Sequence, residues 1–175
     1  ELAKLSYLDQ GPLLAVEFLN KNGIHLIIEP HLNHTYLDGA SMLLADGTPV
    51  LALTLRYDRL DNFWFVLFHE LAHLVLHLSN DTSESFLEDL DSKSDKTEER
   101  EADRWALDSL INPEIWKTSG LNDKSDYADI KNFARNLRIS PSIPAGRLAK
   151  ETGDYRKFSK LVGNGKVRSL FLQPE

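Results

Sequence analysis

Residues 69–77 read HELAHLVLH, and the first five letters match the metal-binding pattern H-E-x-x-H. Side chains four residues apart lie on one face of a helix, so His69 and His73 can bind the same ion. Glu70 is rotated about 100° from His69 and can reach a water molecule at the ion without being a ligand. The stretch therefore has the arrangement of a metallopeptidase, with two ligands and a general base in one helical turn.

The residues around this pattern favour a metal site over a chance match. By itself, H-E-x-x-H occurs by accident roughly as often as it marks a zinc site. Residues 62–78 are apolar almost all round, which predicts a helix buried in the domain. Three ionisable groups in such a helix cost several kcal/mol unless they are compensated, and a metal ion is the usual compensation.

Two histidines do not complete a tetrahedral zinc site, so a third protein ligand is needed. A metzincin would carry a histidine six residues after His73, where this chain has Ser79. His77 points the same way as His73 but lies one turn, about 5.4 Å, further along the helix axis, which favours a structural role for it. The third ligand is therefore expected from another segment.

A predicted helix at 98–111 offers candidates for this ligand. Glu98 and Glu99 both lie near its apolar stripe, whereas Glu101 is turned away from it. Asp103 follows Glu99 by four residues on the same face, and a ligand histidine usually donates its second ring N–H to a carboxylate or carbonyl. We therefore predict Glu99 as the third ligand and Asp103 as the acceptor for a ligand histidine.

Two histidines and one carboxylate leave a fourth position open, which is typical of catalytic rather than structural zinc. Glu70 would then act as general base toward water activated by the ion. Candidate donors to the oxyanion of a substrate are Tyr36, His34, His77 and Arg147, and the sequence does not rank them. Imidazole ligands and the motif favour one zinc ion per chain over manganese.

Composition limits the class of protein. The chain has 175 residues, no cysteine and a formal net charge of −7, so we expect one domain without disulfides. Residues 81–103 hold ten acidic and three basic side chains, a balance that opposes binding to nucleic acid. The longest apolar stretch, Phe63–Leu76, is too short to cross a bilayer, and no signal peptide begins the chain. These features predict a soluble cytoplasmic protein without membrane contact.

Periodicity predicts an α+β fold with a small sheet. Asp46-Gly47 between two apolar runs predicts a hairpin at 41–57, and GIHLIIE at 23–29 predicts a buried strand. The polar, acidic residues 79–97 predict a surface connection. Helices are expected at 11–22, 62–78, 98–111, 127–137, 143–152 and 155–161. We expect a mainly antiparallel sheet packed on the H-E-x-x-H helix, with the hairpin beside the metal cleft.

Two separated motifs resemble the ImmA/IrrE family of metallo-endopeptidases. They are FVLFHELAHLVLH at 65–77 and EREADRWA at 99–106, which LINP follows. LDGASMLLADGTPVLALT at 37–54 is similar to the hairpin that precedes the active helix of the family. The resemblance covers about residues 12–113 and implies a zincin-like domain.

Residue by residue, the resemblance implies His69, His73 and Glu99 as zinc ligands and Glu70 as the catalytic base. Many members have Asn where this chain has Asp103, which is at least as good a hydrogen-bond acceptor. The implied activity is cleavage of a specific regulatory protein, so the expected substrate is a repressor or an antitoxin-like protein. General protein digestion is not implied.

The segment ISPSIPAGRLAKETG at 139–153 is similar to a subgroup in which this domain follows a helix-turn-helix of the repressor or HigA-antitoxin type. Because the first residue is not Met, we expect that such a DNA-binding domain precedes this chain and makes any DNA contact. Residues 1–113 are expected to form the metallopeptidase core and residues 114–175 a helical extension packed on it. Two alternatives stay open: a sensor or partner-binding domain of a transcriptional regulator or antitoxin with little peptidase activity, and a metal-free fold.

Overall fold

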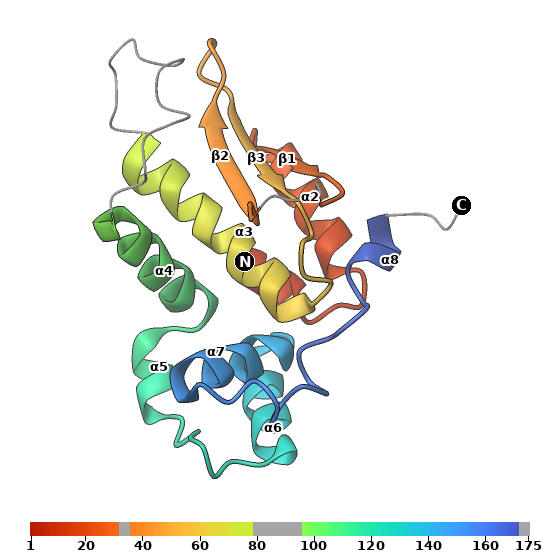
Figure 1. Cartoon of the computed structure of the whole chain (residues 1–175), viewed down its shortest axis with the longest axis vertical. Coiled ribbons are helices and arrows are strands. Elements are labelled where there is room, and N and C mark those ends of the chain that lie inside the picture. The colour runs from red at the N-terminus through yellow and green to blue at the C-terminus, as the bar shows by residue number, and fades with distance from the viewer. Residues whose placement is uncertain (32–35, 79–95, 172–175) are drawn as a thin grey trace.

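The computed structural model describes residues 1–31, 36–78 and 96–171. Its helices and strands form the predicted α+β fold, in which a small sheet and a set of helices surround one central helix (Figure 1). Most of the connection predicted at 79–97 lies outside the described residues. The helices are α1 (Leu2–Leu5), α2 (Gly11–Lys21), α3 (Leu60–Ala72), α4 (Lys96–Leu110), α5 (Pro113–Thr118), α6 (Tyr127–Leu137), α7 (Ser142–Thr152) and α8 (Arg168–Phe171).

The sheet has three strands, β1 (His25–Ile28), β2 (Gly39–Leu43) and β3 (Pro49–Leu53), in the order β1-β3-β2. The predicted hairpin is present, because β2 and β3 pair antiparallel around Asp46 and Gly47. Gly47 has a positive φ of 82°, which this turn requires, and the Thr48 N–H donates to Asp46 Oδ1.

The sheet is mixed rather than mainly antiparallel, because β1 pairs with β3 in parallel. The chain reverses direction between β1 and β2 and again at the hairpin, so β1 and β3 run the same way. The central strand β3 separates β1 from β2, which leaves β1 and β2 at opposite edges of the sheet.

The H-E-x-x-H helix was predicted as one α-helix over 62–78. Instead, α3 ends at Ala72 and continues as a π-helix, η1 (His73–His77). π-Helical turns are rare, appear mostly as single turns within α-helices, and are frequent at functional sites. The change of helix type begins at the second histidine of the motif.

The helix predicted at 155–161 is wrong. Hydrogen bonds from Ser159 N–H to Arg156 O and from Leu161 N–H to Phe158 O span three residues, as in successive turns. Asp154 accepts from the backbone N–H groups of Arg156 and Lys157, as a helix N-cap does, but no α-helix continues from it. The helices at 127–137 and 143–152 are present as α6 and α7.

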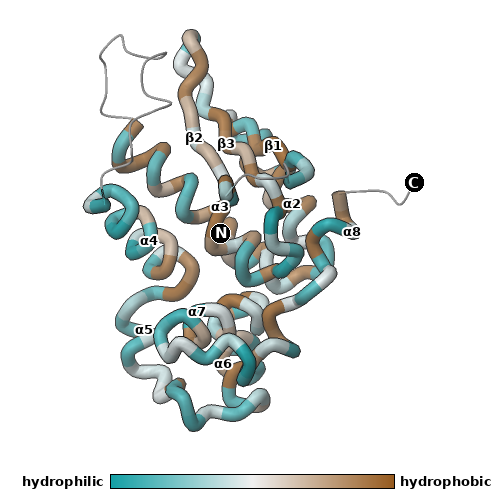
Figure 2. The backbone as a smooth tube through the Cα atoms, viewed as in Figure 1, coloured by the Kyte–Doolittle hydropathy of each residue, from teal (hydrophilic) through white to brown (hydrophobic). Residues whose placement is uncertain are grey.

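The main core forms around α3. Trp64 and Leu67 of α3 are fully buried, together with Leu51 of the central strand. The same core includes Ile143 of α7 and Val167 near the C-terminal helix. In Figure 2, hydrophobic residues recur along the strands and α3. Figure 1 shows the sheet on one side of α3 and α4 beside its other side, and α7 packs on α3 as well.

Candidate metal centre

Three ligand-type side chains meet between α3, η1 and α4. His69 Nε2 lies 3.0 Å from His73 Nε2 and 3.3 Å from Glu99 Oε2. His73 Nε2 lies 3.5 Å from Glu99 Oε1. The two histidines are four residues apart near the end of α3, and Glu99 is in the first turn of α4. The packing of α4 along α3 therefore brings the third group to the histidine pair.

These distances fit a tetrahedral metal ion. Bonds of about 2.0–2.1 Å to nitrogen or oxygen place neighbouring ligand atoms of a tetrahedron about 3.3 Å apart. The three side chains offer one ligand atom each within 4.8 Å of one another. Both histidine side chains are 15% exposed and Glu99 is 45% exposed, so the group opens toward solvent on the side of Glu99.

Asp103 lies where a ligand histidine needs an acceptor. Its Oδ1 is 3.0 Å from His69 Nδ1, and Lys150 of α7 donates to its Oδ2 at 2.8 Å. Burial raises the pKa of Asp103, but the hydrogen bonds with His69 and Lys150 together lower it by more, so the pKa lies below its ordinary value. An ionised Asp103 accepts the Nδ1 proton of His69, which turns the lone pair of Nε2 toward His73 and Glu99.

The two histidines respond differently to their surroundings. Burial lowers the pKa of His69, but the hydrogen bond with Asp103 and the charges of Glu70 and Glu99 outweigh it, so the pKa is raised. Burial and the neighbouring His69 lower the pKa of His73. A lowered pKa keeps His73 neutral, which is the form that binds a metal ion.

Glu70 lies beside the three ligand-type groups but faces the sheet. Burial raises its pKa to about 7, against the opposing effects of His69 and of a hydrogen bond with Ser41. A carboxyl group with a pKa near neutrality can both accept and release a proton at physiological pH.

The strand β2 closes the other side of this cleft. A Cβ atom at Gly39 would lie 2.7 Å from Glu70 Oε1 and 2.9 Å from Val66 Cγ1, so only glycine fits against the carboxylate here. The cleft has a volume of about 370 Å³, and Asp38, Gly39 and Phe65 line it together with the three ligand-type residues and Glu70. One wall is thus the end of a strand and the other is α3.

The family model of the IrrE N-terminal-like domain, Peptidase_M78, matches residues 20–149, more than half of the chain. The chain belongs to this family. The matched span contains the strands, α3, α4 and most of α7, so the metal centre lies within the IrrE N-terminal-like domain. No match was found among curated proteins. The family match and the His–His–Glu group support a metallopeptidase-type domain that binds a metal ion.

The candidate oxyanion donors lie in different places. Tyr36 is 85% exposed and its ring lies under the Arg56 guanidinium. The His77 ring is 5.3 Å from the His73 ring, and its buried Nε2 has no hydrogen-bond partner in the described part of the chain. His34 lies outside the described residues.

Arg147 does not join the metal centre. It donates to Glu151 and to the Leu107 carbonyl, and its guanidinium stacks on Trp116 at 4.6 Å. These contacts hold Arg147 in the packing between α7 and α4, beside a second cavity.

Lys150, Gly39 and Ser41 also contact this site and were not predicted from the sequence. Gly39 lies two residues before the predicted hairpin, and its contact with Glu70 depends on how β2 packs on α3. Lys150 is 47 residues from Asp103, and no spacing rule connects the two. Among the described residues, no helix is both long and apolar enough to cross a membrane.

Proposed function

We propose that this IrrE N-terminal-like domain is a zinc-dependent, site-specific endopeptidase. The observation that carries the proposal is the convergence of His69, His73 and Glu99 next to the buried Glu70, whose pKa is about 7. Two imidazoles and one carboxylate leave a coordination position free, which is the pattern of catalytic zinc sites. Glu70 occupies a position beside this opening without being one of the three convergent groups.

A bound zinc ion would supply a Lewis acid that polarises a carbonyl group and lowers the pKa of water. Glu70 would take the proton of the attacking water and deliver it to the amine that leaves, because its pKa allows both steps near pH 7. Asp103 would keep His69 in the tautomer that turns Nε2 toward the ion.

Purified protein loaded with zinc should cleave one protein encoded near its own gene, at a single position. Candidate substrates are the repressors and antitoxin-like proteins of the same locus, which we propose as cytoplasmic partners. Glu70→Gln should remove cleavage while zinc content stays at about one ion per chain. Equal cleavage by wild-type protein and Glu70→Gln would overturn the assignment of the base. Elemental analysis distinguishes zinc from manganese.

We also propose how an extended substrate binds. β2 is an edge strand whose first residue, Gly39, lines the cleft beside Glu70. A peptide can add to such an edge through main-chain hydrogen bonds. Hydrogen exchange of Glu70→Gln protein with bound substrate should then slow at the amides of β2. Unchanged exchange there, with tight substrate binding, would refute this mode.

A second candidate function is sensing within a transcriptional regulator or antitoxin that carries a helix-turn-helix domain before this chain. Helix α7, which carries the resemblance to that subgroup, reaches the metal centre through Lys150 and Asp103. The sequence of the complete gene tests this: a helix-turn-helix segment upstream of Glu1 supports it. Protein with that segment should then bind operator DNA differently with and without zinc.

A further inference from the structure

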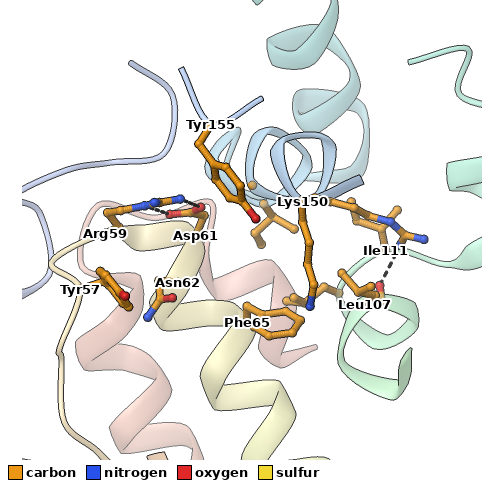
Figure 3. Close-up of a pocket in the computed structure, with 13 residues that line it drawn as sticks. Tyr57, Arg59, Asp61, Asn62, Phe65, Leu107, Ile111, Lys150 and Tyr155 are labelled. Carbon is orange, nitrogen blue, oxygen red and sulfur yellow. Dashed lines mark hydrogen bonds and ion pairs between the residues drawn. The ribbon is translucent and has the colours of Figure 1, made fainter. Parts of the chain in front are cut away.

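A cavity of about 380 Å³ lies next to the metal cleft, between α3, α4 and α7 (Figure 3). It is distinct from the cleft that holds the ligand-type residues, but Phe65 lines both. Phe65 precedes His69 by four residues, and the centres of the two rings are 6.0 Å apart. The cavity therefore begins about one helical turn from the metal centre.

Lys150 also connects the two spaces. Its ammonium group lies 4.3 Å from the centre of the Phe65 ring while it donates to Asp103, the partner of His69. Figure 3 shows the Lys150 side chain extending from α7 to Phe65 across the cavity. The boundary between cavity and metal cleft is thus made of two side chains rather than backbone.

The charges on the cavity wall are paired. Arg59 binds Asp61 through two hydrogen bonds, Arg147 binds Glu151, and Lys150 binds Asp103. An ionic ligand would have to break one of these pairs to gain a partner, and leaving the other member unpaired is costly. The paired charges therefore favour an occupant without charge.

Apolar side chains and the uncharged Tyr57, Asn62 and Tyr155 supply the remainder of the wall. Leu110, Ile111 and Ile143 are buried residues of the core that border the cavity, and Phe65 and Leu107 are half-buried beside it. The volume is near the lower end of the range for small-molecule pockets, about 300–1,000 Å³. It suits one large side chain or a ligand of similar size.

We propose that this cavity receives a large, uncharged apolar side chain of the substrate, from a residue close to the bond that is cut. An extended chain advances about 3.3 Å per residue, so a residue flanking the bond at the metal centre can reach a cavity one turn away along α3. This inference rests on the proposed peptidase function. It adds the chemical class of the residue that fixes where the substrate is cut.

Two substitutions test the pocket without touching the metal ligands. Leu107→Trp places an indole in the cavity, and Ser109→Trp is the matched control, because Ser109 is exposed on the same helix and does not line the cavity. Tyr155→Ala enlarges the cavity at a residue that is 57% exposed, so the fold should tolerate it.

With zinc-loaded protein and a peptide library, wild-type cuts should share a leucine, methionine or aromatic residue at one fixed position. Replacing that residue by alanine should slow cleavage roughly 10- to 150-fold, the factor expected for losing one large buried apolar side chain. Leu107→Trp should reverse this preference toward small residues, Tyr155→Ala should admit larger ones, and Ser109→Trp should behave as wild type. An acidic or basic residue at every cut, or the same preference in all four proteins, would overturn the proposal.

A binding experiment separates this proposal from the peptidase function. N-acetylphenylalanine amide should shift the NMR signals of Leu110 and Ile143 in metal-free protein and in Glu70→Gln, and should fail to do so in Leu107→Trp. Binding without any cleavage by wild-type protein would uphold the pocket and refute the peptidase. Cleavage without a side-chain preference, together with no binding of N-acetylphenylalanine amide, would refute the pocket but not the peptidase. Stronger binding of N-acetylaspartate amide than of N-acetylphenylalanine amide would show that the cavity does not prefer an apolar side chain.

Discussion

Gly39→Ala should disable the metal centre without removing a ligand. The added Cβ would lie 2.7 Å from Glu70 Oε1, 2.8 Å from Glu70 Cγ and 2.9 Å from Val66 Cγ1. Ordinary contacts between such atoms are about 3.5 Å, so the Glu70 carboxylate must move by roughly 0.7 Å or β2 must shift away from α3. Gly39 is not among the residues with positive φ, so the effect comes from this contact and not from backbone strain.

A displacement near 1 Å of a catalytic group costs on the order of 100-fold in rate. We therefore expect kcat/KM for the cleaved partner to fall about 100-fold in Gly39→Ala, with zinc content unchanged. Overpacking of this kind lowers the free energy of unfolding by about 1–3 kcal/mol. The assay is cleavage kinetics at saturating zinc, combined with elemental analysis and thermal unfolding.

Ala40→Val is the matched control. Successive strand residues face opposite sides of the sheet, so the bulk added at Ala40 points away from Glu70. It should leave kcat/KM near the wild-type value. Wild-type kcat/KM in Gly39→Ala would refute the close contact, and equal losses in both variants would show that the strand, rather than Glu70, is sensitive.

Three further outcomes follow from the same contacts. In metal-free protein, Glu70 stays protonated in the folded state up to a pKa of about 7, above its ordinary value of 4.5, so its contribution is fully favourable below pH 4.5 and is lost as the pH rises through 7. Between pH 4.5 and 7 the free energy of unfolding of the wild-type protein, measured with urea, should therefore decline by about 3 kcal/mol more than that of Glu70→Gln. The same pH dependence in both proteins would contradict the effect of burial on Glu70. Asp103→Ala should weaken zinc binding about 10- to 100-fold in a competition titration, and Lys150→Met, which keeps an apolar chain on Phe65, less than about tenfold. Zinc should raise the melting temperature of the wild-type protein but not of His69→Ala, and an equal rise in both would place the ion elsewhere.

Local patterns predicted the fold where short-range interactions decide it. The bounds of α6 agree with the predicted 127–137 because Asp126 and Asp129 form a capping box at its start. The hairpin was predictable for the same reason, since Asp46-Gly47 carries its own turn geometry. The predicted helix at 155–161 is wrong although Asp154 accepts hydrogen bonds as a helix N-cap does, because the backbone bonds that follow span only three residues.

Long-range packing decided what the sequence could not predict. The parallel pairing of β1 depends on which edge of β3 is free, and no local residue specifies that edge. The spacing of His69 and His73 places both on one face of a helix, but Glu99 approaches them only because α4 packs along α3. The contact of Lys150 with Asp103 needs α7 in addition, so it has no signature in the sequence.

The hairpin turn and the metal centre are linked through strand register. Gly39 pairs with Leu53 and Leu43 with Pro49, a register that the short loop around Asp46 and Gly47 fixes. A slip of one residue would turn Ala40 toward α3, where a methyl group does not fit against Glu70. The turn residues at the far end of the hairpin therefore help to determine which residue of β2 lies against the Glu70 carboxylate.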